Sequence, residues 1–290
     1  MSHGNVVVTG ASTGIGRACA LYLDRKGWRV FAGVRKEEDG RALAGRASER
    51  LHPLMLDVTD DVAVAKAGET VREAAGEDGL QGLVNNAGLA IGGPLEFLPL
   101  EDIRDQFEVN LFGQVAVTQA MLPMIRQGQG RIVNMSSVSG RAAAPLLGPY
   151  AGSKFALEAM SDALRVELQP WDIAVIVVEP GAIKTPIWNR GIARAEQIRE
   201  RLPEAAEHFY GEAMDRLIQA ARESDERGIP PAKVARAVYR ALSAKRPKTR
   251  YVIGRDARIT TLAGWLLPDR ALDRVKTRKV GLPGPGEGLQ

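Results

Sequence analysis

The chain has 290 residues, of which 45% are hydrophobic and 26% charged, and its formal net charge is +4. This composition is typical of a globular protein with a sizeable core. No apolar run reaches the roughly 18 residues that a transmembrane helix needs. The N-terminus lacks a charged stretch followed by an apolar segment, so no secretory signal is expected.

Cysteine and histidine usage narrows the function classes further. Cys19 is the single cysteine, which excludes an internal disulfide and fits a reducing compartment, so we expect a cytoplasmic protein. The three histidines, His3, His52 and His208, are far apart and have no metal-ligand spacing. We therefore expect no metal site.

The first predicted strand covers residues 5–9, and a helical pattern follows from Arg17 to near Gly27. A glycine-rich turn of spacing G-x-x-x-G-x-G joins the two. Such a turn lets the backbone approach a pyrophosphate, to which the helix N-terminus offers free N–H groups. The strand and the helix are the context that supports a dinucleotide site. Its predicted residues are Gly10, Ser12, Thr13, Gly14, Ile15 and Gly16.

The second predicted strand, residues 29–34, ends just before Arg35 and Lys36. An acidic residue at this position would bind the ribose hydroxyls of NAD. A guanidinium instead suits the 2′-phosphate of NADP. The sequence therefore predicts that NADP(H) is favoured over NAD(H), with Arg35 as the main contact. The alternative is that Arg35 is a solvated loop residue.

The following segments alternate between strand and helix patterns. Strands are predicted at 51–58, 80–88, 131–137 and 173–181, and helices at 60–75, 101–126 and 150–168. This alternation predicts an α/β fold with a parallel, doubly wound sheet. Ligands bind such sheets at the carboxyl ends of the strands. Asp57, Asn86, Ser137 and Gly181 lie at those ends. Asn110 falls inside the helix at 101–126, where the alternative is a solvated helical Asn.

Tyr150 and Lys154 are four residues apart in a segment of helical spacing, so they share one helix face. A free tyrosine has a pKa of about 10. An ammonium one turn away favours the phenolate, so we expect Lys154 to lower the pKa of Tyr150 toward working pH. Taken alone, the alternative is an ordinary surface pair.

The pattern changes after Pro186. Residues 187–230 are charged and helix-prone, and they are too long for a simple connection, so we expect a helical insert or lid. Its apolar residues either line a pocket or dock the insert, and the sequence leaves both open. A helix at 232–244 and a strand at 250–254 follow. The apolar residues of the insert are Ile187, Trp188, Ile192, Ile198, Leu202, Phe209, Tyr210, Met214 and Leu217.

The C-terminal extension, residues 255–280, is basic and apolar. Residues 245–279 carry eleven Lys or Arg residues against three Asp residues. This combination suggests contact with a membrane surface or an acidic partner. The alternative is a packed C-terminal helix with exposed cations. Residues 281–290 are Gly- and Pro-rich and are expected to be disordered.

Six ordered motifs resemble those of the classical short-chain dehydrogenases/reductases over most of residues 5–255. They are Thr9-Gly10-x-x-x-Gly14-x-Gly16, Asn85-Asn86-Ala87-Gly88, Asn110, Ser137, Tyr150-x-x-x-Lys154 and Pro180-Gly181-x-Ile183-x-Thr185. The stretches around Val109–Gly113, Ser153–Ala159 and Val178–Gly181 resemble the branch of retinol dehydrogenases, 17β-hydroxysteroid dehydrogenases and mitochondrial 3-hydroxybutyrate dehydrogenase.

The resemblance implies one Rossmann-like domain over residues 1–280 with a seven-stranded parallel sheet. It implies an NAD(P)-dependent oxidoreductase that moves a hydride between nicotinamide and a secondary alcohol or ketone, or a retinoid-type alcohol or aldehyde. The expected substrate is hydrophobic, such as a steroid, retinoid or lipid-like carbonyl compound. A homodimer or homotetramer is also implied.

The resemblance assigns roles residue by residue. Tyr150 exchanges the substrate proton, Lys154 holds the nicotinamide ribose, and Asn110 holds a water for proton relay. Ser137 binds the substrate oxygen, with Ser136 as its rival. Asp57 and Val58 would contact the adenine, Asn86, Ala87 and Gly88 the adenosine ribose, and Pro180, Gly181, Ile183 and Thr185 the carboxamide end.

Three rival functions remain. One is a cofactor-sensing binding protein that kept the fold and lost the chemistry. Another is a ketoacyl-thioester reductase, which the long insert disfavours. The sequence pI of about 9.3 alone suggests a nucleic-acid binder, but no recognisable motif supports it, so no nucleic-acid partner is expected.

Overall fold

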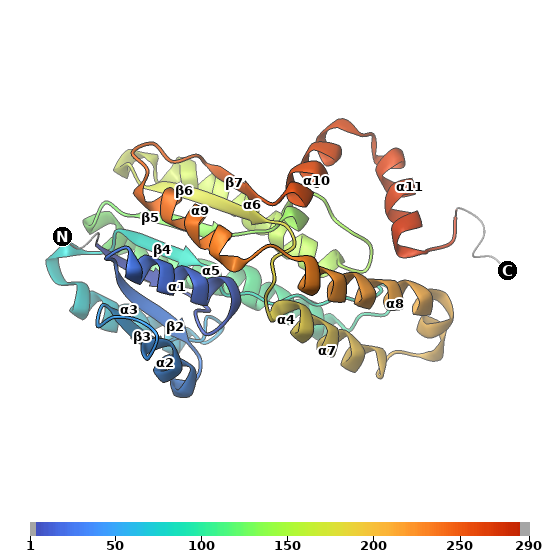
Figure 1. Cartoon of the computed structure of the whole chain (residues 1–290), viewed down its shortest axis with the longest axis horizontal. Helices are drawn as coiled ribbons and strands as arrows, with labels where there is room; N and C mark the ends of the chain where they lie inside the picture. The colour runs from blue at the N-terminus through green and yellow to red at the C-terminus, as the bar shows by residue number, and fades with distance from the viewer. Residues whose placement is uncertain (1–3, 285–290) are drawn as a thin grey trace.

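The computed structural model describes residues 4–284 and has a seven-stranded parallel sheet at its centre, with the order β3-β2-β1-β4-β5-β6-β7 (Figure 1). The predicted fold class is confirmed. The sheet grows from β1 toward both of its edges, because β1 pairs with β2 on one side and with β4 on the other. This reversal places the turn after β1 at the switch point of the sheet. The strands are β1 Asn5–Val8, β2 Arg29–Val34, β3 Leu51–Met55, β4 Gly82–Asn85, β5 Arg131–Met135, β6 Ala174–Pro180 and β7 Arg250–Ile253.

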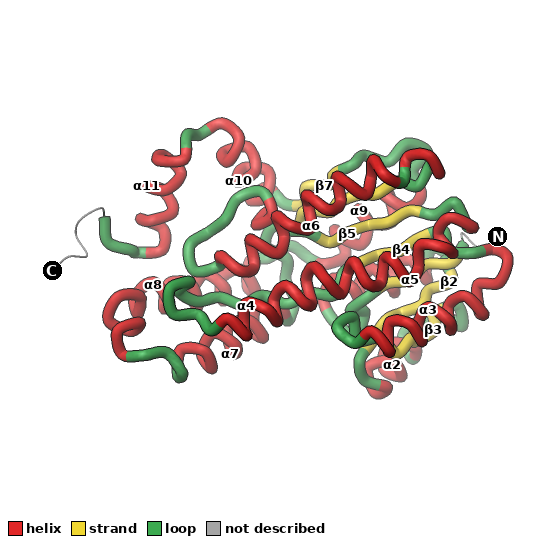
Figure 2. The backbone as a smooth tube through the Cα atoms, turned by 180° about the vertical axis from the view of Figure 1, so that it is seen from behind, coloured by secondary structure: helices red, strands yellow, loops and turns green. Residues whose placement is uncertain are grey.

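Helices cover both faces of the sheet, and an apolar cluster fills each side (Figures 1 and 2). The strands are buried on both faces, which explains their continuous Val- and Ile-rich runs. On one face lie α1 Gly14–Arg25 and α9 Pro231–Ser243, with α2 Glu37–Ala44 near the edge. The other face carries α3 Asp61–Ala75, α5 Gly113–Gln127 and α6 Gly148–Glu167. Three 3₁₀ turns, η1 Gly76–Asp78, η3 Val138–Gly140 and η4 Gln169–Trp171, join elements.

The predicted helix at 101–126 is interrupted at the candidate site residue. It consists of α4 Leu100–Phe107, a π-helical turn η2 Glu108–Phe112, and α5. Such π turns are frequent at functional sites. Asn110 lies in this turn and is 0% exposed. Its alternative as a solvated helical residue is therefore wrong.

The insert forms two helices, α7 Ile187–Arg199 and α8 Glu204–Arg227, that pack together beside α4. Its apolar residues mainly dock it: Ile198 and Leu202 pack against Ile91 and Leu98, and Met214 packs against Leu146. Phe209 is exposed. Ile198, Leu202 and Met214 thus dock the insert on the rest of the protein.

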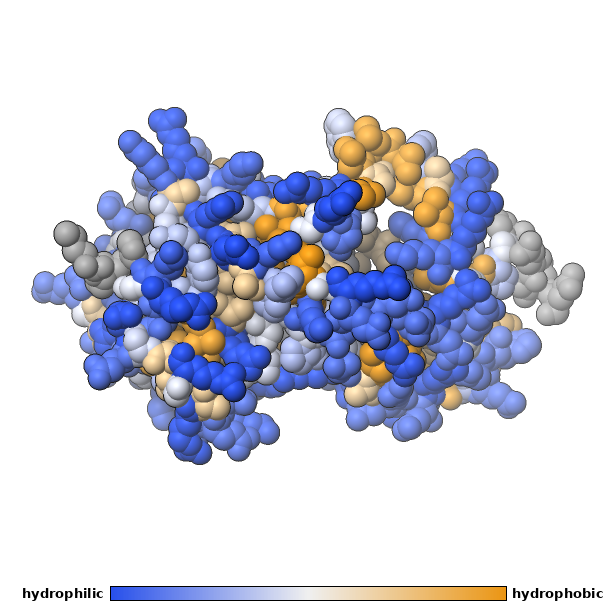
Figure 3. Space-filling model, in the orientation of Figure 1, coloured by the Kyte–Doolittle hydropathy of each residue, from blue (hydrophilic) through white to orange (hydrophobic). Residues whose placement is uncertain are grey.

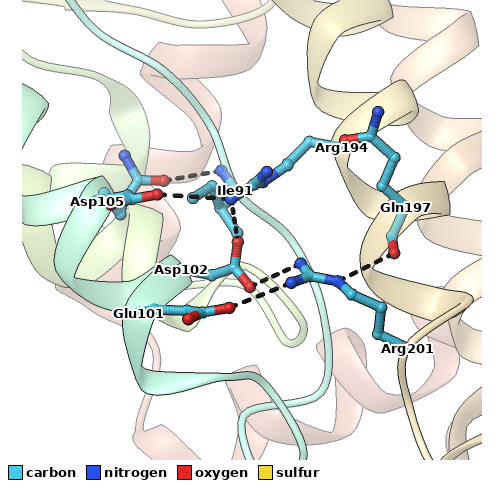
Figure 4. Close-up of polar contacts among 8 residues, drawn as sticks. Ile91, Glu101, Asp102, Asp105, Arg194, Gln197 and Arg201 are labelled. Carbon is cyan, nitrogen blue, oxygen red and sulfur yellow. Dashed lines mark hydrogen bonds and ion pairs between the residues drawn. The ribbon is translucent and has the colours of Figure 1, made fainter.

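A buried carboxylate fastens the insert to α4. Asp102 is fully buried and accepts hydrogen bonds from Arg194 and Arg201, the latter at 3.1 Å (Figure 4). Arg201 also contacts Glu101 at 3.2 Å, and Arg194 lies 3.5 Å from Asp105. Two arginines from one helical hairpin thus converge on one carboxylate, which holds the insert in a defined position.

The C-terminal extension forms α10 Arg255–Leu266 and α11 Asp269–Val280, which project beyond β7 (Figure 1). No helix within residues 4–284 is both long and apolar enough to cross a bilayer. Residues 281–284 of the tail that was expected to be disordered are ordered: Leu282 packs near Met214 and donates its N–H to the carbonyl oxygen of Thr277 at 3.2 Å. The rest of that tail, residues 285–290, lies outside the described part of the chain.

Candidate active site

The glycine turn between β1 and α1 has the backbone conformation that a phosphate cradle needs. Gly10 and Gly14 have φ of +62° and +54°, a backbone conformation that residues with a side chain rarely adopt. A Cβ on Gly16 would collide with the carbonyl group of Gly10 and lie 2.5 Å from Nδ2 of Asn86. The turn therefore requires glycine at all three predicted positions, and it leaves its backbone open to a pyrophosphate.

Thr9 and Asn86 join the turn to the end of β4. Oγ1 of Thr9 accepts hydrogen bonds from the backbone N–H groups of Asn86 and Ala87, both at 2.9 Å. Nδ2 of Asn86 donates to the carbonyl oxygen of Thr9 at 2.9 Å. Thr9 belongs to the first sequence motif, which predicts no site role for it. Its hydroxyl holds two predicted cofactor residues in register with the glycine turn.

Arg35 and Asp57 lie together past the ends of β2 and β3. Nη1 of Arg35 is 3.9 Å from Oδ2 of Asp57, and the Arg35 side chain is 70% exposed. An exposed pair at this distance is weak, so the guanidinium is free to turn toward an anion. Oδ1 of Asp57 accepts from the backbone N–H and hydroxyl of Thr59. Val58 is buried in the core beside α5.

The segment after β6 approaches the glycine turn from the other side. A Cβ on Gly14 would lie 3.2 Å from Cβ of Thr185. Ile183 is buried and bridges to Ile229, and Gly181 donates its N–H to the carbonyl oxygen of Ile253 at 2.9 Å. Residues 180–185 therefore form a fixed wall opposite the turn.

Tyr150, Ser137 and Lys154 meet at the carboxyl edge of the sheet. The side chain of Ser137 lies close enough to the Tyr150 hydroxyl to favour its ionised form, and Oγ of Ser137 accepts a hydrogen bond from the backbone N–H of Ser139 at 3.1 Å. Lys154 is 4% exposed and donates from Nζ to the carbonyl oxygen of Met135 at 2.8 Å. The helical spacing and the strand ends thus bring three predicted residues together.

Ser136 points elsewhere. Its hydroxyl is buried and has no hydrogen-bond partner among the described residues. A Cβ on Gly140 would lie 2.7 Å from this hydroxyl and 3.2 Å from Cγ of Glu158. Of the two rival serines, Ser137 is therefore the one whose hydroxyl contacts Tyr150.

Burial governs the ionisation of this group. It raises the pKa of Tyr150, and the hydrogen bond from Ser137 opposes the rise. The expectation that Lys154 lowers the Tyr150 pKa below its ordinary value is wrong for this arrangement, because burial dominates and Nζ is directed at Met135. Burial also lowers the pKa of Lys154 to about 8, and the nearby charge of Glu158 opposes this fall.

Asn110 ties the loop after β4 to α6. Its Oδ1 accepts from the N–H of Leu89 at 2.9 Å, and its Nδ2 donates to Oγ of Ser153 at 3.1 Å. A Cβ on Gly88 would lie 3.2 Å from this Oδ1 and 3.8 Å from Nζ of Lys154. Asn110, Gly88 and Lys154 are therefore immediate neighbours.

Gln106 is a supporting residue that the sequence did not reveal. It is fully buried one turn before Asn110, and its Oε1 accepts from the N–H of Ile91 at 2.7 Å. Its Nε2 donates to the carbonyl oxygen of Leu89 at 2.8 Å. Gln106 and Asn110 together hold the start of the loop that leads from the site to the insert.

Comparison with known proteins gives one family. The family model described as short chain dehydrogenase matches residues 4–196. The chain is 39% identical to the NADPH-dependent 3-dehydrocapnine reductase of Ornithobacterium rhinotracheale, over 93% of this chain and 94% of the relative. It is 41% identical to retinol dehydrogenase 5 of Mus musculus, over 98% and 90% of the two chains.

Solved structures agree with this assignment. A short-chain dehydrogenase from Streptomyces avermitilis superimposes with a TM-score of 0.76 at 29% identity, covering 97% of this chain and 98% of the other. A short chain dehydrogenase from Burkholderia cenocepacia in complex with NADP gives 0.73 at 26% identity, covering 97% and 99%.

Proposed function

This chain belongs to the short-chain dehydrogenase/reductase family and is an NAD(P)-dependent oxidoreductase, and we propose that it uses NADPH to reduce a hydrophobic ketone or aldehyde. The observation that carries the proposal is that Tyr150, Ser137 and the buried Lys154 lie together at the same sheet edge as the glycine turn. The names of the relatives, a 3-dehydrocapnine reductase, a retinol dehydrogenase and a 17-beta-hydroxysteroid dehydrogenase, favour a hydrophobic substrate.

The chain's own residues divide the work of the reaction. Nicotinamide, when bound, supplies the hydride. Tyr150 gives its proton to the substrate oxygen, and Ser137 donates a hydrogen bond that holds this oxygen in place. Because burial raises the pKa of Tyr150, its hydroxyl is protonated at neutral pH, which is the form that reduction needs. Lys154 holds the nicotinamide ribose, and Asn110 supports the proton relay behind it.

The glycine turn fits the adenosine and pyrophosphate part of the cofactor. A side chain at Gly10 or Gly16 would collide with neighbouring backbone atoms. Because both positions are glycine, no side chain covers the N–H groups at the start of α1, and a pyrophosphate can approach them. We assign Ser12, Thr13, Gly14 and Ile15 to the same cradle. Asp57, Val58 and the segment from Asn86 to Gly88 would bind the adenosine, and Pro180, Gly181, Ile183 and Thr185 the carboxamide end.

A substrate panel tests the proposal. NADPH absorbance is followed with steroids, retinoids, long-chain carbonyl compounds and short ketoacids. We expect the highest kcat/KM with one of the hydrophobic classes. Turnover of short ketoacids alone would contradict the substrate class. Tight NADPH binding without turnover of any carbonyl compound would instead favour the cofactor-sensing protein.

Arg35 is proposed to select NADPH through its charge. In Arg35→Glu we expect KM for NADPH to rise about 10- to 100-fold, because a charge-assisted hydrogen bond to the 2′-phosphate is replaced by repulsion. KM for NADH should change little or fall. Lys36→Glu, one residue further on and equally exposed, is the matched control. Equal effects of the two variants on KM for NADPH would refute the role of Arg35.

The C-terminal extension is proposed to contact an anionic membrane surface. Large apolar residues are exposed along α10, with Trp265 at 82%, and an apolar area marks this part of Figure 3. The basic excess of residues 245–279 complements acidic headgroups. The exposed apolar residues of α10 and the residue after it are Ile259, Leu262, Trp265, Leu266 and Leu267.

Flotation with phosphatidylcholine vesicles, with and without phosphatidylserine, measures this contact. We expect salt-sensitive binding to the phosphatidylserine vesicles that Trp265→Ser largely removes. Trp171→Ser, at an exposed Trp in η4, should leave binding unchanged. If the unaltered protein stays in the unbound fraction at the bottom of the gradient at low salt, the proposed membrane contact is wrong.

We also propose a homo-oligomer formed through the long helices. Phe112 in the π turn and Phe155 and Met160 of α6 are large apolar residues exposed on these helices. Light scattering should give a dimer or tetramer mass, and a monomer mass at micromolar concentration would rule it out.

The buried, free Cys19 is consistent with the proposed cytoplasmic location.

A further inference from the structure

A buried ionic cluster lies directly behind Lys154. Glu158 of α6 is 5% exposed and Glu179 of β6 is 1% exposed. Arg250 of β7 reaches both, with Nη2 3.0 Å from Oε2 of Glu158 and Nε 3.2 Å from Oε1 of Glu179. Nη2 of Arg250 also lies 2.7 Å from Oδ2 of Asp162 at the outer rim. Helix α6 and strands β6 and β7 thus bring four charged groups together, one helical turn beyond Lys154.

The Arg250 guanidinium contacts all three carboxylates of this cluster, and two of these carboxylates are buried. Buried carboxylates are costly unless they are paired and hydrogen-bonded. Yet Oε1 of Glu158 has no hydrogen-bond partner among the described residues, and Oε1 of Glu179 has only its ion pair with Arg250. Burial and the neighbouring Glu158 raise the pKa of Glu179 to about 7. The two neighbouring carboxyls therefore hold a proton more readily than isolated carboxyls do.

Lys154 is the second cation close to Glu158. The two residues are four apart on α6, as Tyr150 and Lys154 are, so Tyr150, Lys154 and Glu158 form one stripe of the helix. The backbone also closes here: a Cβ on Gly140 would lie 3.1 Å from the carbonyl oxygen of Lys154 and 3.2 Å from Cγ of Glu158. Little space remains for Glu158 to turn away.

We propose that Glu158 is a positioning residue for the reaction: its buried carboxylate keeps Lys154 charged, while Arg250 holds that carboxylate in place. The proposal rests on the proposed function through the role of Lys154 in nucleotide binding. Glu179 acts as the second carboxyl of the pair. The other charged groups around the cluster are Arg141, which acts on Glu179, and Asp162 with Arg165 at the rim.

The sign of the effect follows from the ionisation of Lys154. Burial lowers its pKa to about 8, and the charge of Glu158 holds it up. Removing that charge favours the neutral amine, so Lys154 should lose its proton at a lower pH. A neutral Lys154 holds the ribose hydroxyls less well, so nucleotide affinity should weaken at a lower pH too.

The test compares NADPH affinity across pH, measured by nucleotide fluorescence, in Glu158→Gln and the unaltered protein. We expect the pH midpoint of the affinity loss to fall by about one unit in the variant. Asp162→Asn is the matched control, because it removes the rim partner of the same arginine, and its midpoint should stay in place. A Glu158→Gln profile that superimposes on that of the unaltered protein overturns the proposal.

A second measurement separates this proposal from the proposed function. The NMR titration of the Lys154 Cε resonance, assigned through Lys154→Met, needs no nucleotide and should show the same shift. If the unaltered protein binds no NADPH while the resonance shifts, the proposed function fails, but the effect of Glu158 on the charge of Lys154 stands. Should Glu158→Gln not fold, Glu158→Asp keeps the charge further away, and a smaller shift in the same direction is expected; an unmoved resonance overturns the proposal.

Discussion

Replacing Tyr150 by Phe should lower kcat by about 10²- to 10⁴-fold, the usual value of general acid–base help. Phe keeps the ring and its packing on α6 and loses only the hydroxyl, which lies beside Ser137. NADPH affinity should therefore stay nearly unchanged. Single-turnover kinetics with saturating NADPH and fluorescence titration of the nucleotide measure the two quantities separately.

The control for this substitution is Tyr239→Phe. Tyr239 lies on α9 and stacks edge-on against Tyr22 of α1, on the far side of the sheet from α6. It should retain full turnover. A Tyr150→Phe enzyme that turns over at the rate of the Tyr239→Phe enzyme would show that the proton comes from another group, and the assignment of Tyr150 would be wrong.

Gly16→Ala should weaken NADPH binding by about 10- to 100-fold, since overpacking here costs about 1–3 kcal/mol. The added Cβ would meet the carbonyl group of Gly10, which is backbone and cannot turn aside, and Nδ2 of Asn86 at 2.5 Å. The turn would have to open, and the N–H groups at the start of α1 would move away from the pyrophosphate. Isothermal titration with NADPH measures the loss.

Gly45→Ala provides the matched control for the same chemical change. Gly45 caps α2 with φ of −62°, and an added Cβ would have its nearest contact at 3.5 Å. It should bind NADPH as the unaltered protein does. Equal affinity of Gly16→Ala and Gly45→Ala would mean that the dinucleotide does not lie on this turn.

The sheet and its strand ends could be predicted because parallel strands buried on both faces leave continuous apolar runs. The runs ending near Asp57, Asn86 and Ser137 therefore marked the carboxyl edge correctly. The boundaries were less accurate: β3 ends at Met55, two residues before Asp57. Helix α2 was missed because it has eight residues, contains Gly40, and buries only Leu43 besides that glycine.

The supporting contacts could not be predicted, because they join residues far apart in the chain. Asp102 on α4 receives Arg194 and Arg201 from the insert, across more than 90 residues (Figure 4). In the sequence these arginines look like an ordinary solvated charged face. The π turn at Asn110 was hidden for a similar reason, since its residues fit an unbroken helix and only the packing around Leu89 reveals the bulge.

The ionisation of the site shows the same limit. The spacing of Tyr150 and Lys154 predicts their common face, but the pKa of each depends on burial, which the spacing does not contain. Burial raises the Tyr150 pKa and lowers that of Lys154 to about 8. The carboxylate that opposes the second shift, Glu158, lies on the same stripe and reads as an ordinary helical Glu in the sequence.

We propose that this chain transfers a hydride from NADPH to a hydrophobic carbonyl compound held by Tyr150 and Ser137. NADPH that carries deuterium in both C4 positions of the nicotinamide provides the test, with the product analysed by mass spectrometry. We expect deuterium on the carbinol carbon of a steroid, retinoid or lipid-like product. The Tyr150→Phe enzyme should form little of this labelled product. Product that carries no deuterium, or NADPH that stays unconsumed with every such compound, would contradict the account.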